Sequence, residues 1–168
     1  MISPVRALLT FPNPVNEKAA RTVAAGVVVL SALILISGWY WLTIPLAYGF
    51  WARVLTGPTL SPLGWTAQNL IAPALGRARP VPGPPKRFAQ AMGAAMSSAA
   101  LVLGLVLGLG TAADVVLGLL VVAAGLESVL GLCLGCRVFA LLMGLGLVPE
   151  QVCAECADIS GRLARAGS

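Results

Sequence analysis

Four cysteines, arranged as two Cys-x-x-Cys pairs, are the residues of this chain best suited to chemistry. The pairs are Cys133/Cys136 and Cys153/Cys156, and the chain has no other cysteine and no histidine. Without histidine the chain lacks the commonest metal ligand and the commonest general base at neutral pH. Any chemistry in this protein is therefore expected to use thiols or carboxylates.

The context of the two pairs favours two separate dithiols. In a helical Cys-x-x-Cys the second sulfur lies about one turn beyond the first, so each pair can form a disulfide or hold a soft ion alone. Cys133 and Cys136 continue an apolar run and are expected to end a membrane helix. Residues 137–144 are apolar and helix-forming, which would hold the pairs apart. The alternative is a four-thiolate zinc site, which suits the spacing and requires a sharp turn at residues 144–146.

Charges beside the cysteines predict which sulfurs ionise. Cys153 follows Pro149, which is typical of a helix start, and a helix N-terminus lowers a thiol pKa. Glu155 opposes that effect. Arg137, directly after Cys136, is expected to favour a thiolate on Cys136 if its side chain turns toward the sulfur.

Glu127 is the fifth candidate site residue, about two turns before Cys133 in an apolar run. An ionised carboxylate is costly inside a bilayer, so a functional role is the first expectation. Glu127 is expected to accept a proton from a thiol or to pair with Arg53 or Arg87; the alternative is a carboxyl that only ties helices together. Asp114, at an outer turn, is expected to be a solvated helix cap.

The elements that position these residues follow from composition. The 168 residues are 58% hydrophobic and 10% charged, with six acidic residues, which is too little polar surface for a water-soluble globule. The predicted fold class is all-α, an integral membrane four-helix bundle built from two helical hairpins. The predicted spans are residues 20–38, 40–55, 88–109 and 113–134.

Two further segments complete the prediction. Residues 56–87 form a proline-rich cytoplasmic loop in which Ser61-Pro62 begins a short helix, lying either in the membrane interface or on the protein's own cytosolic face. Residues 137–168 form a short helical tail that carries the second dithiol. Small residues recur in the third span and predict close helix packing compatible with a homo-oligomer: Gly93, Ser97, Gly104 and Gly108.

Orientation follows from the basic residues, which flank the first span and the middle loop and are missing from both short turns. The positive-inside rule then puts both termini and the loop in the cytoplasm, where ordinary thiols stay reduced. The net charge is +5, but the basic residues lie in short stretches beside apolar runs, so nucleic-acid binding is not expected. Residues 1–18 do not resemble a signal peptide and are predicted to be peripheral.

Several motifs resemble the bacterial membrane family called domain of unknown function 4395. They are Arg87-Phe88-Ala89-Gln90, Leu126-Glu127 and Cys133-Leu134-Gly135-Cys136-Arg137-Val138-Phe139, with Asn16, Arg21, Arg53 and Ser61-Pro62 at similar places. Residues 153–159 are similar to an extension in some members. The resemblance implies a multi-pass, four-span protein of the bacterial inner (plasma) membrane, often suspected of acting with thioredoxin-like or sulfur-transfer proteins.

These observations predict three alternative functions, each for a protein embedded in the lipid bilayer. The first is a dithiol protein that exchanges reducing equivalents or sulfur with a thioredoxin-like partner at the cytoplasmic face and needs no cofactor. The second is a cysteine ladder that transports a soft metal or sulfane sulfur. The third is a structural zinc site on a membrane scaffold. Whether the chain is an enzyme stays open.

Overall fold

The computed structural model describes residues 11–148, and this part of the chain is mostly helical, as predicted. The helices in order are α2 (Glu17–Ser37), η1 (Tyr40–Leu42), α3 (Thr43–Thr56), α4 (Pro62–Thr66), η2 (Ala67–Ile71), α5 (Ala72–Ala74), α6 (Gly83–Leu101), η3 (Val102–Val106), α7 (Gly110–Leu130) and α8 (Leu134–Gly144). Two short strands, β1 (Val15–Asn16) and β2 (Pro80–Val81), form an antiparallel pair that the all-α prediction did not include.

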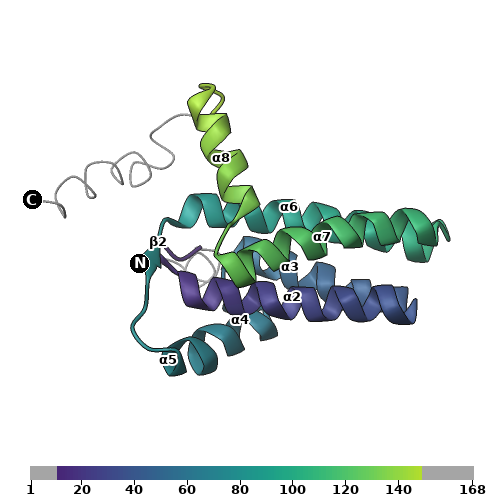
Figure 1. Ribbon diagram of the computed structural model, residues 1–168, viewed down its shortest axis with the longest axis horizontal. Coiled ribbons are helices and arrows are strands. Elements are labelled where there is room, and N and C mark those ends of the chain that lie inside the picture. Colours follow the sequence, from purple (N-terminus) through teal and green to yellow (C-terminus); the bar gives the residue numbers. More distant parts are fainter. Residues whose placement is uncertain (1–10, 149–168) are drawn as a thin grey trace, which may run out of the picture.

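Helices α2, α3, α6 and α7 lie side by side along the long axis of the molecule (Figure 1). Their main contacts are between α2 and α7 and between α3 and α6, while the consecutive helices α2 and α3 touch far less. The prediction of two hairpins is therefore incomplete, because α2 and α3 pack chiefly on α7 and α6 and not on each other. Long-range packing, which local sequence does not encode, sets this pairing.

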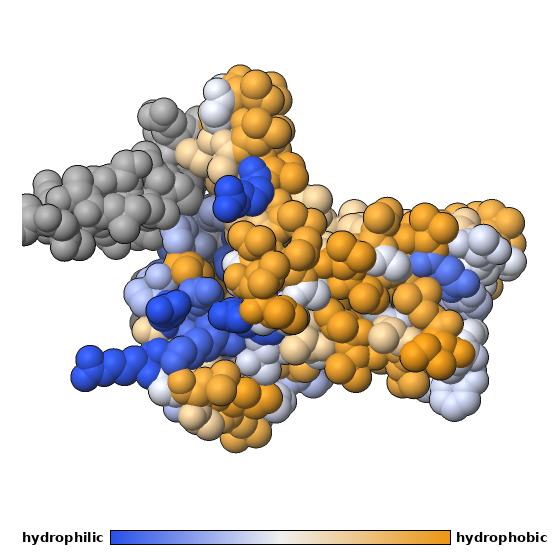
Figure 2. Space-filling model, in the orientation of Figure 1, coloured by the Kyte–Doolittle hydropathy of each residue, from blue (hydrophilic) through white to orange (hydrophobic). Residues whose placement is uncertain are grey.

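Within residues 11–148, three helices are long and apolar enough to cross a membrane: Glu17–Ser37, Gly83–Val106 and Gly110–Leu130. The predicted span at residues 40–55 is instead a 3-10 turn followed by α3, which has 14 residues against the roughly 20 that a span needs. Gly38 ends α2 with a left-handed backbone (φ 68°), so the aromatic segment after it does not continue the helix. Large apolar side chains cover the outside of the bundle (Figure 2), among them Ile36, Val106 and Val129.

The small residues of α6 and η3 have a different use from the predicted one. A side chain at Gly93 would collide with the ring of Phe50, and one at Gly104 with the ring of Tyr40. These glycines therefore leave space for aromatic rings of α3 and η1 to pack against the helix backbone. Gly108 touches nothing and has a positive φ of 65°, which suits the turn before α7.

One end of the bundle collects the other elements: the β pair, α4 to α5, and α8 (Figure 1). The predicted start of α4 is confirmed, since the Ser61 hydroxyl accepts a hydrogen bond from the Gly64 N–H at 3.2 Å and Pro62 follows. Ala67 and Ala72 pack against α2, whereas Leu70 stays exposed. All basic residues of the described part also belong to this end, which we call the basic end: Lys18, Arg21, Arg53, Arg77, Arg79, Lys86, Arg87 and Arg137.

Candidate functional site

The first cysteine pair is positioned by the end of α7. Gly131 has a left-handed backbone (φ 70°). Its N–H donates to the carbonyl of Glu127 at 3.0 Å, and the N–H of Leu132 donates to the carbonyl of Leu126 at 3.1 Å. This termination favours glycine, because other residues are strained in that conformation. The guanidinium of Arg21 donates to the carbonyls of Ser128 and Val129 and so joins α2 to the end of α7. The prediction that the cysteines continue the fourth span to residue 134 is therefore wrong.

Cys133 instead begins a new helix. Its backbone is extended, and its sulfur accepts the N–H of Cys136 at 3.3 Å as the N-cap of the 11-residue helix α8. The sulfur thus lies at the end of the helix where the dipole favours negative charge. Cys133 is buried and Cys136 is half-buried, and both are free thiols.

The two sulfurs of this pair differ in acidity. The Cys136 thiol donates a hydrogen bond to Cys133, and this bond does most to lower the Cys133 pKa below its ordinary value. The Lys86 ammonium and the Cys136 N–H act in the same direction, against burial and the Glu127 carboxylate. Donating this hydrogen bond, together with burial, raises the pKa of Cys136. Cys133 is therefore the more readily ionised of the two thiols, and Cys136 is the one that keeps its proton.

Glu127 pairs with Lys86, at 2.5 Å between Nζ and Oε1, and not with Arg53 or Arg87. Arg87 is exposed and donates to the carbonyl of Val54. Lys86 lies in the predicted loop, but the helix that carries it begins at Gly83, so the ammonium points into the bundle end and is only 8% exposed. Pro84 and Pro85 are the signal that was overlooked, since proline is favoured in a first helical turn.

Arg137 does not take the predicted role beside Cys136, because its side chain is exposed and the cation that acts on both sulfurs is Lys86. Asp114 is also not a solvated cap. At the opposite end of the bundle its carboxylate accepts a hydrogen bond from the Tyr40 hydroxyl at 2.9 Å, which connects η1 to α7.

Helix α8 is held against α6 at two points. Gly135, between the cysteines, packs so closely that an added Cβ would lie 2.6 Å from the Cα of Ala89. One turn further, the ring of Phe139 meets that of Phe88 with centroids 5.6 Å apart. These contacts fix the orientation of the dithiol relative to Lys86 and Glu127, and the sequence alone gave no reason to single out Gly135.

Two cavities meet at Cys133. An open cleft of about 450 Å³ is lined by both cysteines together with Lys86, Glu17 and Arg137. A more apolar cavity of about 290 Å³ runs between α2, α3, α6 and α7 and is lined by Phe50, Met92, Leu120, Glu127 and Cys133. The buried sulfur is thus reached from the polar surface and from the inside of the bundle.

Cys153 and Cys156 lie outside the described residues, so the structure does not place the second pair. Within residues 11–148 no three cysteine, aspartate or glutamate side chains are grouped closely enough to hold a metal ion. A zinc site would need the second pair and stays a prediction.

In the described part of the chain, the fold and site define a helical protein with three membrane-length helices and a dithiol at the start of a helix at the basic end. The chain belongs to the family described as domain of unknown function (DUF4395), whose model matches residues 15–144. The match includes Cys133, Cys136, Lys86 and Glu127 and ends before the second pair. No curated protein and no solved structure is significantly similar to the chain.

Proposed function

We propose that this protein is a multi-pass protein of the bacterial inner membrane that carries out thiol-disulfide exchange, with Cys133 as the attacking thiolate. The observation that carries the proposal is the N-cap geometry of Cys133, which puts a lowered pKa on one sulfur and a proton donor, Cys136, beside it. A lowered pKa raises the fraction of the reactive thiolate at neutral pH.

The exchange has two steps. The Cys133 thiolate attacks a disulfide of a thioredoxin-like partner, forming a mixed disulfide and releasing one partner thiolate. Cys136 then gives its proton to the partner thiolate released first and attacks the Cys133 sulfur. The second partner thiolate leaves and is protonated by water, and the Cys133–Cys136 disulfide remains. The reverse sequence reduces the pair again. Cys153 and Cys156, on the tail, would exchange with the first pair in the same way.

Orientation in the membrane supports contact with a cytoplasmic partner. The exposed apolar side chains along the bundle suit lipid, and α3 would complete a fourth, shorter crossing of a four-helix bundle. Because the described basic residues gather at the end that holds the cleft, the positive-inside rule puts that end and both termini in the cytoplasm. Within residues 11–148 the cysteines occur only at the basic end, which argues against a cysteine ladder across the bundle.

The first test measures the acidity of Cys133 in a Cys153→Ser, Cys156→Ser background. Iodoacetamide alkylation of Cys133 is followed against pH by mass spectrometry. Cys136→Ala removes the hydrogen bond that lowers the Cys133 pKa, so the pKa should rise and the rate at pH 7 should fall about tenfold, as expected for one such bond. Cys136→Ser keeps a donor and should lose less. An unchanged rate in Cys136→Ala would contradict the assigned roles.

The second test follows the exchange itself. Purified protein in lipid nanodiscs is oxidised with diamide and mixed with reduced thioredoxin, and the thiols are counted by gel shift with a bulky maleimide. The Cys133–Cys136 disulfide should form and be reduced. In the Cys153→Ser, Cys156→Ser background, Cys136→Ser mixed with oxidised thioredoxin should accumulate a mixed disulfide on Cys133. Failure to form or reduce the disulfide would refute the proposal. One zinc per chain by elemental analysis, with thiols that resist alkylation, would instead support the zinc scaffold.

A further inference from the structure

A second buried cation lies near Lys86, at the basic end of the bundle. Arg53, near the end of α3, is only 5% exposed, and Lys86 is 8% exposed. The carboxylate of Glu127 pairs with Lys86, and within residues 11–148 Arg53 has no ion-pair partner. Arg53 therefore holds a buried charge with no carboxylate of the described residues in contact with it. An uncompensated buried charge is costly, so it is expected to attract an anion.

One nitrogen of the Arg53 guanidinium makes no hydrogen bond to the described residues. Nε donates to the amide oxygen of Gln90 at 2.8 Å, and Nη1 donates to the Ser61 hydroxyl at 3.1 Å. The guanidinium also lies over the ring of Phe50, 4.6 Å from its centroid. Nη2 is buried and has no hydrogen-bond partner among the described residues. Buried donors are almost always satisfied, so this one calls for a ligand.

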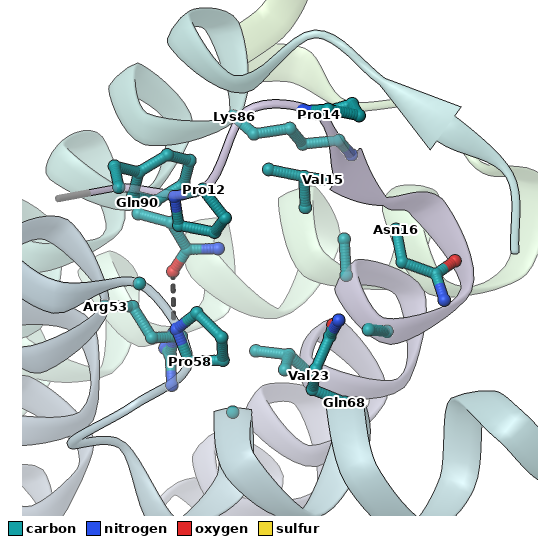
Figure 3. Close-up of a pocket in the computed structure, with 15 residues that line it drawn as sticks. Pro12, Pro14, Val15, Asn16, Val23, Arg53, Pro58, Gln68, Lys86 and Gln90 are labelled. Carbon is teal, nitrogen blue, oxygen red and sulfur yellow. Dashed lines mark hydrogen bonds between the residues drawn. The ribbon is translucent and has the colours of Figure 1, made fainter.

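Arg53 and Lys86 both line a cavity of about 90 Å³ (Figure 3). Pro12, Pro14 and Val15 line it together with residues of α2 and α6. Within the described chain, none of the residues that line this cavity is acidic. The space exceeds the roughly 10–15 Å³ that one water needs, and it is far smaller than a typical pocket for an organic ligand of about 300–1,000 Å³.

The Gln90 amide is oriented as a donor toward this space. Its oxygen accepts from Arg53, which leaves the NH₂ group on the other side, and Figure 3 shows that nitrogen turned to the cavity. The Gln68 side chain reaches the same space from η2. Guanidinium, ammonium and amide N–H groups around a small cavity are the donors that bind oxyanions.

We propose that this cavity binds a small inorganic oxyanion of the sulfate or phosphate class, held by Arg53 and Gln90 with Lys86 at its edge. The anion supplies the missing negative charge and an acceptor for Nη2. A free ion is favoured over a lipid phosphate because the cavity of about 90 Å³ is closer in size to the ion alone than to a phosphate with its glycerol backbone. This inference is independent of the thiol chemistry proposed above.

The test uses the full chain, delipidated in a neutral detergent. Equilibrium dialysis with radiolabelled sulfate or phosphate should give saturable binding of one ion per chain, and the thermal unfolding midpoint should rise over the same concentrations at constant ionic strength in chloride. A short-chain phosphatidate, which offers the same phosphate on a glycerol, should not compete. Competition by the phosphatidate alone would move the ligand to lipid and overturn the proposal.

Gln90→Glu is the decisive variant, because it places a carboxylate on Arg53 with almost no change in shape. It should fold and lose at least about tenfold in affinity, which corresponds to roughly 1.4 kcal/mol. Arg53→Gln should lose binding too, and Arg87→Gln, an exposed arginine at the same end, should keep it. No saturable binding in the unchanged protein, or equal binding in Gln90→Glu, would refute the site.

Discussion

The cleft at Cys133 and the cavity at Arg53 lie at the same end of the bundle, and each contains a nearly buried cation. Lys86 has a carboxylate partner at 2.5 Å, whereas Arg53 has only neutral hydrogen-bond partners among the described residues. Lys86 lines both cavities. The two regions therefore share a basic side chain and differ in how charge is compensated.

This difference separates two uses of a buried cation. The paired Lys86 is held in place and acts through space on the cysteines, where it favours the thiolate while Glu127 opposes it. Arg53 has no carboxylate partner among the described residues, and its Nη2 has no acceptor there. Such a group suits an exchangeable ligand. In a low-dielectric interior such effects are stronger than at the surface.

The largest expected effect comes from breaking the paired side. Lys86→Met leaves Glu127 buried without a partner and should lower the free energy of unfolding by about 3 kcal/mol. Equilibrium unfolding in mixed micelles measures this loss. The double variant Lys86→Met, Glu127→Leu removes both charges and should recover most of it. A double variant as unstable as the single one would show that the ion pair is not what stabilises this region.

A smaller effect is expected from the contact that orients the dithiol. Gly135→Ala forces a methyl group against Ala89 and should cost about 1–3 kcal/mol, the usual range for overpacking. It should also change the alkylation rate of Cys133, because α8 must shift. Gly144→Ala is the matched control, since that position of α8 has open space around it. An equal response at both positions would contradict a specific role for Gly135.

The smallest effect is expected on the unpaired side. In buffer without oxyanions, Arg53→Met loses two hydrogen bonds but also removes an uncompensated buried charge, so the net loss should be about 1 kcal/mol. The same unfolding assay compares it with Lys86→Met. A loss at Arg53 as large as that at Lys86 would remove the contrast between the two regions. Repeating both measurements with sulfate should increase the loss more at Arg53 than at Lys86, which lies at the edge of the cavity.

Much of the architecture was predictable because it depends on local chemistry. Apolar runs predicted the membrane-length helices, and Ser61-Pro62 predicted the start of α4. The end of α7 is not predictable from hydropathy, because Gly131 occurs within an apolar run and hydropathy does not report a left-handed backbone. The partner of Glu127 is not predictable from a proline-rich loop, because Pro84-Pro85 form the first turn of the helix that carries Lys86.

The sequence by itself determined the helical class, the membrane-like composition, the family resemblance and the identity of the thiols, since each depends on residue type and short spacing. Only the tertiary structure decided that Cys133 caps a helix and that Lys86, and not an arginine, pairs with Glu127. It also decided that one donor of Arg53, beside a cavity, has no partner within residues 11–148. These features join residues far apart in the chain, and they arise from which helix faces pack together.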